Sequence, residues 1–186
     1  MYRFIALSAP SGAGKTTIAK LLVRRNKDMV ISVSATTRPQ RSGEKEGVDY
    51  YFMSRHEFET NIRNHNFLEY EQVHENYYGT LRSVVENLVR HGKRIVFDID
   101  VKGALSIRNA YPQESLLIFI QAPSIDDLKQ RLLQRKSESE AAIHLRLKRI
   151  DFEIDQSKFF DHIIINDTLD HTIEKIESLI HANGVD

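Results

Sequence analysis

The chain has 186 residues, of which 41% are hydrophobic and 28% are charged, so its composition is that of a globular domain and not of a disordered or membrane-spanning chain. Its 26 basic and 26 acidic residues give a net charge of zero, which argues against a bulk nucleic-acid binder and confines anion recognition to local clusters. Cysteine is absent, which excludes disulfides and thiolate metal sites.

An apolar strand is expected at residues 3–8, and a glycine-rich turn with the sequence Ala-Pro-Ser-Gly-Ala-Gly follows it, then Lys15 and Thr16. This order predicts a phosphate-binding loop, because the two glycines let successive N–H groups turn toward an anion just before a helix begins. In such a loop the lysine reaches the β- and γ-phosphates and the threonine hydroxyl binds Mg²⁺. Ala9 stands where the general pattern has glycine, but Lys15 and Thr16 are both present.

The next part of the chain changes character at about residue 34, where a stretch without periodicity replaces the alternation of strand and helix. Ser54 followed three residues later by Glu57 forms a capping box, which predicts the start of a helix. We expect a first helix ending near residue 26, strands at residues 30–34, 48–52 and 67–73, and a helix over residues 54–64. Residues 34–80 therefore read as a small α+β insertion.

After the insertion the alternation of helix and strand resumes. The predicted helices cover residues 81–91, 104–110, 124–135, 139–156 and 168–181, and the predicted strands cover residues 94–100, 116–120 and 162–165. Continuous apolar runs such as residues 116–120 are typical of a parallel sheet that is covered on both faces. The expected fold is α/β: a phosphate-loop core with a doubly wound parallel sheet, a small α+β insertion and a helical lid.

Asp98 and Asp100 follow an apolar strand, at the end where parallel sheets place their ligand crevice. In a phosphate-loop enzyme such acids hold Mg²⁺ through water or accept hydrogen bonds from a substrate. Two solvated acids at a strand–loop junction are the alternative, and the phosphate loop upstream favours the functional interpretation for Asp98.

Two further groups of polar residues are candidates for anion binding. In the insertion, arginine forks and phenolic hydroxyls suit a second phosphate, although each could also be solvated or packed, whereas Glu69 needs a partner other than phosphate because like charges repel. The residues of this group are Ser34, Arg38, Arg41, Tyr50, Glu69, Tyr78 and Thr80. A string of arginines flanks a polar break and predicts either a solvated helix face or a lid that closes over phosphates: Arg131, Arg135, Arg146 and Arg149.

Five stretches of this sequence together resemble the guanylate kinase family, essentially from end to end. They are Ser-Ala-Pro-Ser-Gly-Ala-Gly-Lys-Thr-Thr at 8–17, Ser-Val-Ser-Ala-Thr-Thr-Arg-Pro at 32–39, Gly-Val-Asp-Tyr-Tyr-Phe at 47–52, Tyr-Tyr-Gly-Thr at 77–80 and Asp-Ile-Asp-Val-Lys-Gly at 98–103. Alanine at position 9 is similar to what bacterial members of the family carry. The resemblance implies transfer of the γ-phosphoryl group of ATP to GMP, or to dGMP, with Mg²⁺.

The resemblance also implies a single domain in three parts and a role for each matched residue. The parts are a core at 1–33, 81–125 and 157–186, a GMP-binding insertion at 34–80 and a lid at 126–156. ATP would be bound by Ala9, Pro10, Ser11, Gly12, Ala13, Gly14, Lys15, Thr16, Thr17, Arg131, Arg135, Asn166 and Asp167. GMP would be bound by Ser34, Arg38, Arg41, Tyr50, Glu69, Tyr78, Thr80 and Asp100. Mg²⁺ would be held by Thr16 and, through water, by Asp98, and the catalytic residues would be Lys15, Arg38, Arg135 and Arg146.

Arg149 matches no family position, and we expect it to be a surface residue. The chemistry of guanine supports the carry-over, because its N1–H and amino group are adjacent donors that suit the Glu69 carboxylate, and its O6 suits the hydroxyls of Ser34 or Thr80. These residues argue against a kinase of ribose phosphates or of another nucleotide. The intact phosphate loop argues against a scaffolding domain that keeps the fold and binds peptides. We expect no membrane, nucleic-acid or obligatory protein partner, and a cytoplasmic location.

Overall fold

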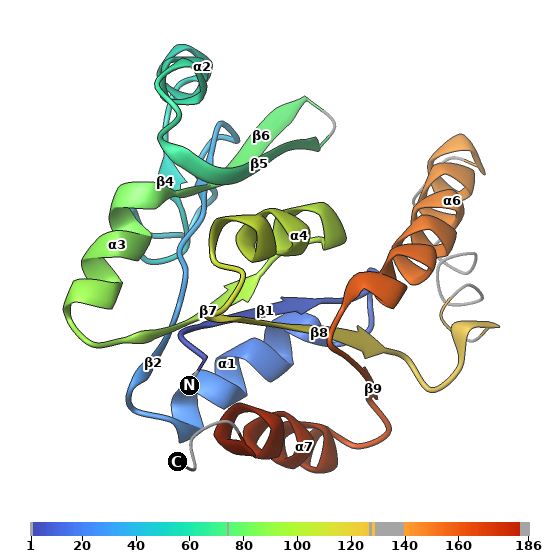
Figure 1. Ribbon diagram of the computed structural model, residues 1–186. Coiled ribbons are helices and arrows are strands. Elements are labelled where there is room, and N and C mark those ends of the chain that lie inside the picture. Colours follow the sequence, from blue (N-terminus) through green and yellow to red (C-terminus); the bar gives the residue numbers. More distant parts are fainter. Residues whose placement is uncertain (1, 74, 127, 129–139, 183–186) are drawn as a thin grey trace.

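The computed structural model describes residues 2–73, 75–126, 128 and 140–182, which form two sheets with helices around them (Figure 1). The first sheet has five strands in the order β2-β7-β1-β8-β9, and every neighbouring pair is parallel. Its strands are β1 (Phe4–Ser8), β2 (Met29–Ile31), β7 (Arg94–Asp98), β8 (Ser115–Gln121) and β9 (His162–Ile165). The predicted α/β fold with a parallel sheet is confirmed.

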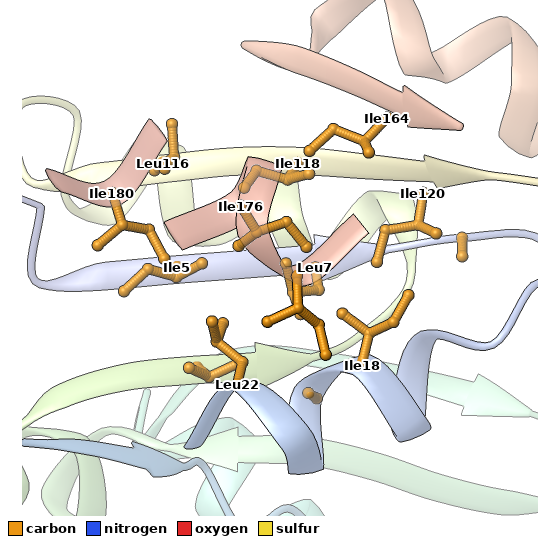
Figure 2. Packing of buried hydrophobic residues seen from close by; sticks show 14 of the residues in the cluster. Ile5, Leu7, Ile18, Leu22, Leu116, Ile118, Ile120, Ile164, Ile176 and Ile180 are labelled. Atoms are coloured by element: carbon orange, nitrogen blue, oxygen red, sulfur yellow. The ribbon is translucent and has the colours of Figure 1, made fainter. Parts of the chain in front are cut away.

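Helices cover both faces of this sheet (Figure 1). Helices α1 (Lys15–Arg25) and α7 (Leu169–Ala182) lie on one face, and α3 (Arg82–Arg90) and α4 (Val101–Ala110) lie on the other. Successive side chains of a strand point to opposite faces, so in β1 Ile5 and Leu7 pack toward α1 and α7 (Figure 2), whereas Phe4 and Ala6 pack toward α3 and α4. This explains why the strand is apolar from Phe4 to Leu7.

The second sheet has four strands in the order β4-β3-β6-β5. They are β3 (Ala35–Thr36), β4 (Tyr51–Phe52), β5 (Phe67–Val73) and β6 (Asn76–Leu81), and β6 pairs antiparallel with both β3 and β5. Helix α2 (Arg55–Arg63) begins at the predicted capping box, in which the Ser54 hydroxyl accepts from the Glu57 N–H and the Glu57 carboxylate accepts from the Ser54 N–H. Phe58 of α2 stacks on Phe67 and Tyr77, which gives this sheet a small core of its own.

Helix α6 (Glu140–Gln156) continues into a short 3-10 helix, η1 (Ser157–Phe159). Figure 1 shows that α6 and the second sheet project from the same side of the first sheet, with α4 between them. The predicted lid helix over residues 124–135 lies largely outside the described residues. None of the helices in the described part of the chain has the length and apolar character that crossing a membrane requires.

Strands β3 and β6 were not predicted, and several element boundaries differ from the sequence-based expectations; β4 covers 51–52 and not 48–52, and β7 ends at Asp98 and not at 100. Strand β6 was not predicted, because Asn-Tyr-Tyr-Gly-Thr-Leu lacks alternation and its strand conformation depends on pairing with β3 and β5. Helix α4 begins at Val101 and not at 104, because the Asp100 carboxylate caps it by accepting from the Gly103 N–H at 2.8 Å. The expected strand at 30–34 is shorter: β2 ends at Ile31, and the chain then crosses to the second sheet.

Gly79 of β6 lies where the two long strands of the second sheet approach most closely, and we predict that Gly79→Ala destabilises the protein. A Cβ atom there would lie 2.8 Å from the backbone oxygen of Glu69 and 2.9 Å from Cβ of Tyr70, neither of which can move without displacing β5. We expect a loss of about 1–3 kcal/mol in the free energy of unfolding, the usual effect of overpacking. Urea unfolding measures it, and an unchanged midpoint would show that β5 and β6 are not held at this separation.

Candidate active site

The glycine-rich turn between β1 and α1 is built around two glycines with left-handed backbone angles. Gly12 has φ +92° and Gly14 has φ +93°, a region that other residues rarely adopt. The Ala13 N–H donates to the Pro10 carbonyl, which closes the turn just before α1 begins at Lys15. No side chain of the described residues caps α1, so its first N–H groups remain available to an anion.

The Asp98 carboxylate contacts the side chains of Lys15 and Thr16, which follow the turn. The Lys15 ammonium lies 2.5 Å from one oxygen of the Asp98 carboxylate and also donates to the Ile99 carbonyl at 2.8 Å. The Thr16 hydroxyl donates to the other carboxylate oxygen at 2.6 Å. The parallel pairing of β1 with β7 sets Leu7 opposite Asp98, which brings residues more than 80 positions apart in sequence to the same edge of the sheet.

A cavity of about 940 Å³ lies over this edge. One side is formed by the whole phosphate loop, residues 9–17, and the opposite side by residues from β5, from the start of α4 and from α6: Gln72, Val73, Asp100, Lys148, Arg149, Phe152 and Glu153. The cavity therefore connects the phosphate loop with both the second sheet and α6, and it is large enough for nucleotide-sized ligands.

Glu69 and Thr80 face each other across β5 and β6. The Thr80 hydroxyl donates to one oxygen of the Glu69 carboxylate at 2.5 Å. The other oxygen points to the first turn of α4, where it lies 3.1 Å from the position that a Cβ atom on Gly103 would occupy; the nearest oxygen of Asp100 lies 3.3 Å from the same position. Burial raises the pKa of Glu69 to about 7, and the nearby charge of Asp100 acts in the same direction. Glu69 and Asp100 thus converge on one small region.

Arg41, Tyr50 and Tyr78, three of the residues predicted for the insertion, lie around Arg38. Its guanidinium pairs with the Glu44 carboxylate at 2.7 Å and lies 5.3 Å from the centre of the Tyr50 ring. The hydrogen bond to Glu44 raises the pKa of Arg38, and Tyr78 contributes in the same direction. The rings of Tyr50 and Tyr78 meet edge to face at 6.0 Å. The backbone N–H of Arg41 donates to the same Glu44 carboxylate, so the two arginines share one acid.

Other predicted residues are placed differently. Ser34 lies directly before β3, where its carbonyl accepts from the Tyr51 N–H. Asn166, after β9, donates to the Ala13 carbonyl at 2.9 Å and so braces the phosphate loop. Asp167 is exposed, and its carboxylate accepts from the Thr168 N–H at the start of α7. Arg146 belongs to α6, and Arg131 and Arg135 lie outside the described residues.

Sequence reasoning missed four charged residues at this site. Glu44 holds Arg38 and Arg41, and Arg149 pairs with Glu71, Asp100 and Glu153. Arg149 is exposed, as expected for a surface residue, but its guanidinium also pairs with three carboxylates. Two sequence signals could have indicated the acids around Arg149. Glu71 shares a face of β5 with Glu69 because it is two residues away, and Glu153 lies one helical turn from Arg149. Burial and the proximity of Asp100 raise the pKa of Glu71 to about 7.

The comparisons with known proteins agree with one another. The family model described as guanylate kinase matches residues 1–183. The guanylate kinases of Chlorobium luteolum and Chlorobium chlorochromatii are 46% and 47% identical to this chain, over 94% and 96% of it and over 88% and 94% of their own lengths. The guanylate kinase of Thermotoga maritima is 40% identical, over 97% of this chain and 86% of its own. A crystal structure of guanylate kinase from Anaplasma phagocytophilum covers 100% of this chain and 87% of its own, with a TM-score of 0.77 and 32% identity.

The contact of Asn166 with the phosphate loop leads to a prediction about nucleotide binding. In Asn166→Ala the Ala13 carbonyl loses its donor and the loop loses its link to β9, so we expect the KM for ATP to rise about tenfold, equivalent to about 1.4 kcal/mol. Thr172→Val removes the hydroxyl that donates to Asn166 at 3.0 Å and should give a smaller rise in the same direction. Steady-state kinetics with ATP varied measure both, and an unchanged KM in Asn166→Ala would contradict the bracing role.

Proposed function

Because the chain belongs to the guanylate kinase family, which phosphorylates GMP with ATP, we propose that ATP binds at the phosphate loop and GMP at the second sheet. The observation that carries this assignment is the cavity of about 940 Å³ that residues 9–17 line together with Gln72 and Val73 of β5 and Asp100 at the start of α4. A phosphoryl donor bound at the phosphate loop and a phosphoryl acceptor bound beside β5 would face each other across this cavity. Phosphoryl transfer depends mainly on such alignment and on neutralising charge.

At the donor side we propose that free backbone N–H groups of the phosphate loop and the ammonium of Lys15 bind the ATP phosphates. Lys15 pairs with Asp98 in this structure and would turn from that carboxylate toward a bound phosphate. Asn166 and Asp167 border the adenine in this proposal.

Mg²⁺ fits the same corner of the site. Thr16 and Asp98 present oxygen atoms next to the phosphate loop, and oxygen is the ligand that Mg²⁺ prefers. Among the residues that the structure describes, no group of three or more His, Cys, Asp or Glu side chains could hold a metal ion by itself. That suits an ion which binds through one or two protein oxygens, water and substrate phosphates. When bound, Mg²⁺ supplies positive charge to the phosphates of ATP.

At the acceptor side we propose that Arg38, Arg41, Tyr50 and Tyr78 bind the phosphate of GMP. The grouping of Arg38, Tyr50 and Tyr78 supports this, as does the Glu44 carboxylate that orients Arg38 through its side chain and Arg41 through its backbone. A guanidinium can form paired charge-assisted hydrogen bonds with a phosphate as it does with a carboxylate. The phosphate oxygen of GMP is itself a competent nucleophile, so we assign no general base.

Guanine would be recognised by Glu69, with Ser34, Thr80 and Asp100 nearby. An ionised Glu69 can accept from both the N1–H and the amino group of guanine, while the Ser34 hydroxyl, or the Thr80 hydroxyl after turning away from Glu69, donates to O6. Adenine has an unprotonated N1 on that edge, which would face the carboxylate lone pair to lone pair. The convergence of Glu69, Thr80 and the first turn of α4 supports this assignment.

We propose the division into a core, a GMP-binding insertion at 34–80 and a lid at 126–156. In that division Arg131, Arg135 and Arg146 approach the phosphates, and closure of the lid excludes water that would otherwise hydrolyse ATP. Use of dGMP and a cytoplasmic location belong to the same proposal.

Glu69→Gln tests the guanine assignment. The amide would direct an NH₂ group at the donors of guanine, so we expect kcat/KM for GMP to fall at least about 100-fold, as for a buried polar group left unpaired. The KM for ATP should change little. Equal losses for both substrates would show that Glu69 does not read the base.

The same assignment predicts a pH dependence. Since the pKa of Glu69 is raised to about 7, the acceptor form required for guanine is complete above that pH, and kcat/KM for GMP should fall as the pH drops through 7. In Glu69→Gln the fall of kcat/KM near pH 7 should disappear, and the fall near pH ~6 that comes from protonation of the GMP phosphate should remain. Glu71→Gln removes the other carboxyl whose pKa is raised to about 7, and in this variant kcat/KM for GMP should still fall as the pH drops through 7.

Asp98→Asn tests the metal assignment. We expect the Mg²⁺ concentration for half-maximal rate to rise about tenfold, the scale on which second-shell partners affect metal affinity. Asp28→Asn is a matched control, because Asp28 pairs with Arg94 at the other end of the same strand. An identical Mg²⁺ requirement in the wild type and in Asp98→Asn would remove Asp98 from the proposed site.

A further inference from the structure

One guanidinium, that of Arg149, connects three separate parts of the chain. From α6 it lies 3.2 Å from the Glu71 carboxylate on β5 and 3.2 Å from the Asp100 carboxylate at the start of α4. It also lies 3.1 Å from Glu153, which is one turn further along α6 and almost fully buried. Arg149 therefore joins α6 both to the second sheet and to the first.

The partners of Arg149 form a concentration of negative charge that needs a cation. Glu71 and Asp100 hydrogen-bond to each other, and burial together with that contact raises the pKa of Glu71 to about 7. Burial alone would raise the pKa of Asp100 as well, but the hydrogen bond from Glu71, the Gly103 N–H and the charge of Arg149 lower it.

Asp100 is fixed from two sides. One of its carboxylate oxygens accepts from the Gly103 N–H at 2.8 Å, and the other faces Arg149. Since Glu69 approaches the same glycine from β5, the position of the Asp100 carboxylate relative to Glu69 depends on what holds its second oxygen. Lys15 and Lys102 also act on this group of acids through their charges, but Arg149 is the cation in direct contact with both Asp100 and Glu71.

We propose that Arg149 is a specificity-positioning residue for the acceptor nucleotide. By pairing with Asp100 and Glu71 it holds the Asp100 carboxylate beside Glu69, where guanine is read, and it keeps α6 attached to that side of the cavity. This inference rests on the proposed placement of guanine at Glu69 and Asp100. Three carboxylates already occupy Arg149, which favours positioning over direct binding of a phosphate.

The first test compares Arg149→Met, which keeps the apolar stem of the side chain, with Arg149→Lys, which keeps a charge. In Arg149→Met we expect the KM for GMP to rise about tenfold and the KM for ATP to change less than about twofold, a size suited to a half-exposed ion pair. Arg149→Lys should restore part of the loss. Arg25→Met is the matched control, because Arg25 is similarly exposed and pairs with Asp170 and Glu177 far from the cavity, and it should leave both constants unchanged.

The second test uses compensation. If Arg149 acts by offsetting the charges of Glu71 and Asp100, then Glu71→Gln should lower the raised KM for GMP in the Arg149→Met background, because the amide can still donate to Asp100. A side chain that merely supports the fold would not be rescued by removing a carboxylate elsewhere.

An unchanged KM for GMP in Arg149→Met would overturn the inference, as would an equal rise in the KM for ATP or a double variant no better than the single one. Asp100→Asn separates this failure from a failure of the proposed site. If Asp100→Asn raises the KM for GMP and Arg149→Met does not, the role of Arg149 is wrong and the guanine site stands. If neither variant changes it, the guanine site itself is misplaced.

Discussion

The parallel pairing of β1 with β7 is the constraint on which the rest of the site depends. It ends both strands at one edge of the sheet, so that Lys15 and Thr16 after β1 meet Asp98 at the end of β7. Between their end residues both strands are apolar, because helices cover both faces of the sheet. The polar chemistry is therefore gathered where the backbone leaves the core, which is the usual place for ligands in such sheets.

On the proposed acceptor side several acids lie close together, which lowers the stability of the protein unless their charges are offset. Glu69, Glu71, Asp100 and Glu153 all lie near the opening between the second sheet and α6, and burial raises the pKa of three of them: Glu69, Glu71 and Glu153. Such crowding lowers stability unless cations and hydrogen-bond donors offset it. A base that presents two adjacent donors gains from the same arrangement, since the carboxylates are already removed from water and held in place.

The sequence was sufficient for the features that depend on local patterns. The apolar run of β1, the alternation of residues 67–73 and the capping box at Ser54 each predicted an element that the structure confirms. Strand β6 was missed because its residues become a strand only through their partners in β3 and β5. Arg149 was missed for a related reason: its three carboxylates come from three elements, and only the folded chain brings Glu71 and Asp100 within its reach.

If an ionised carboxylate on β5 selects the acceptor base, as proposed, then kcat/KM for GMP, IMP and AMP with saturating ATP and Mg²⁺ measures that selection directly. IMP keeps the N1–H but lacks the amino group, whereas AMP has neither donor in place. We expect GMP to exceed IMP by about 10-fold to 100-fold, the scale of one lost hydrogen bond to a charged group, and AMP to be lowest. Comparable values for GMP and AMP would contradict recognition by Glu69.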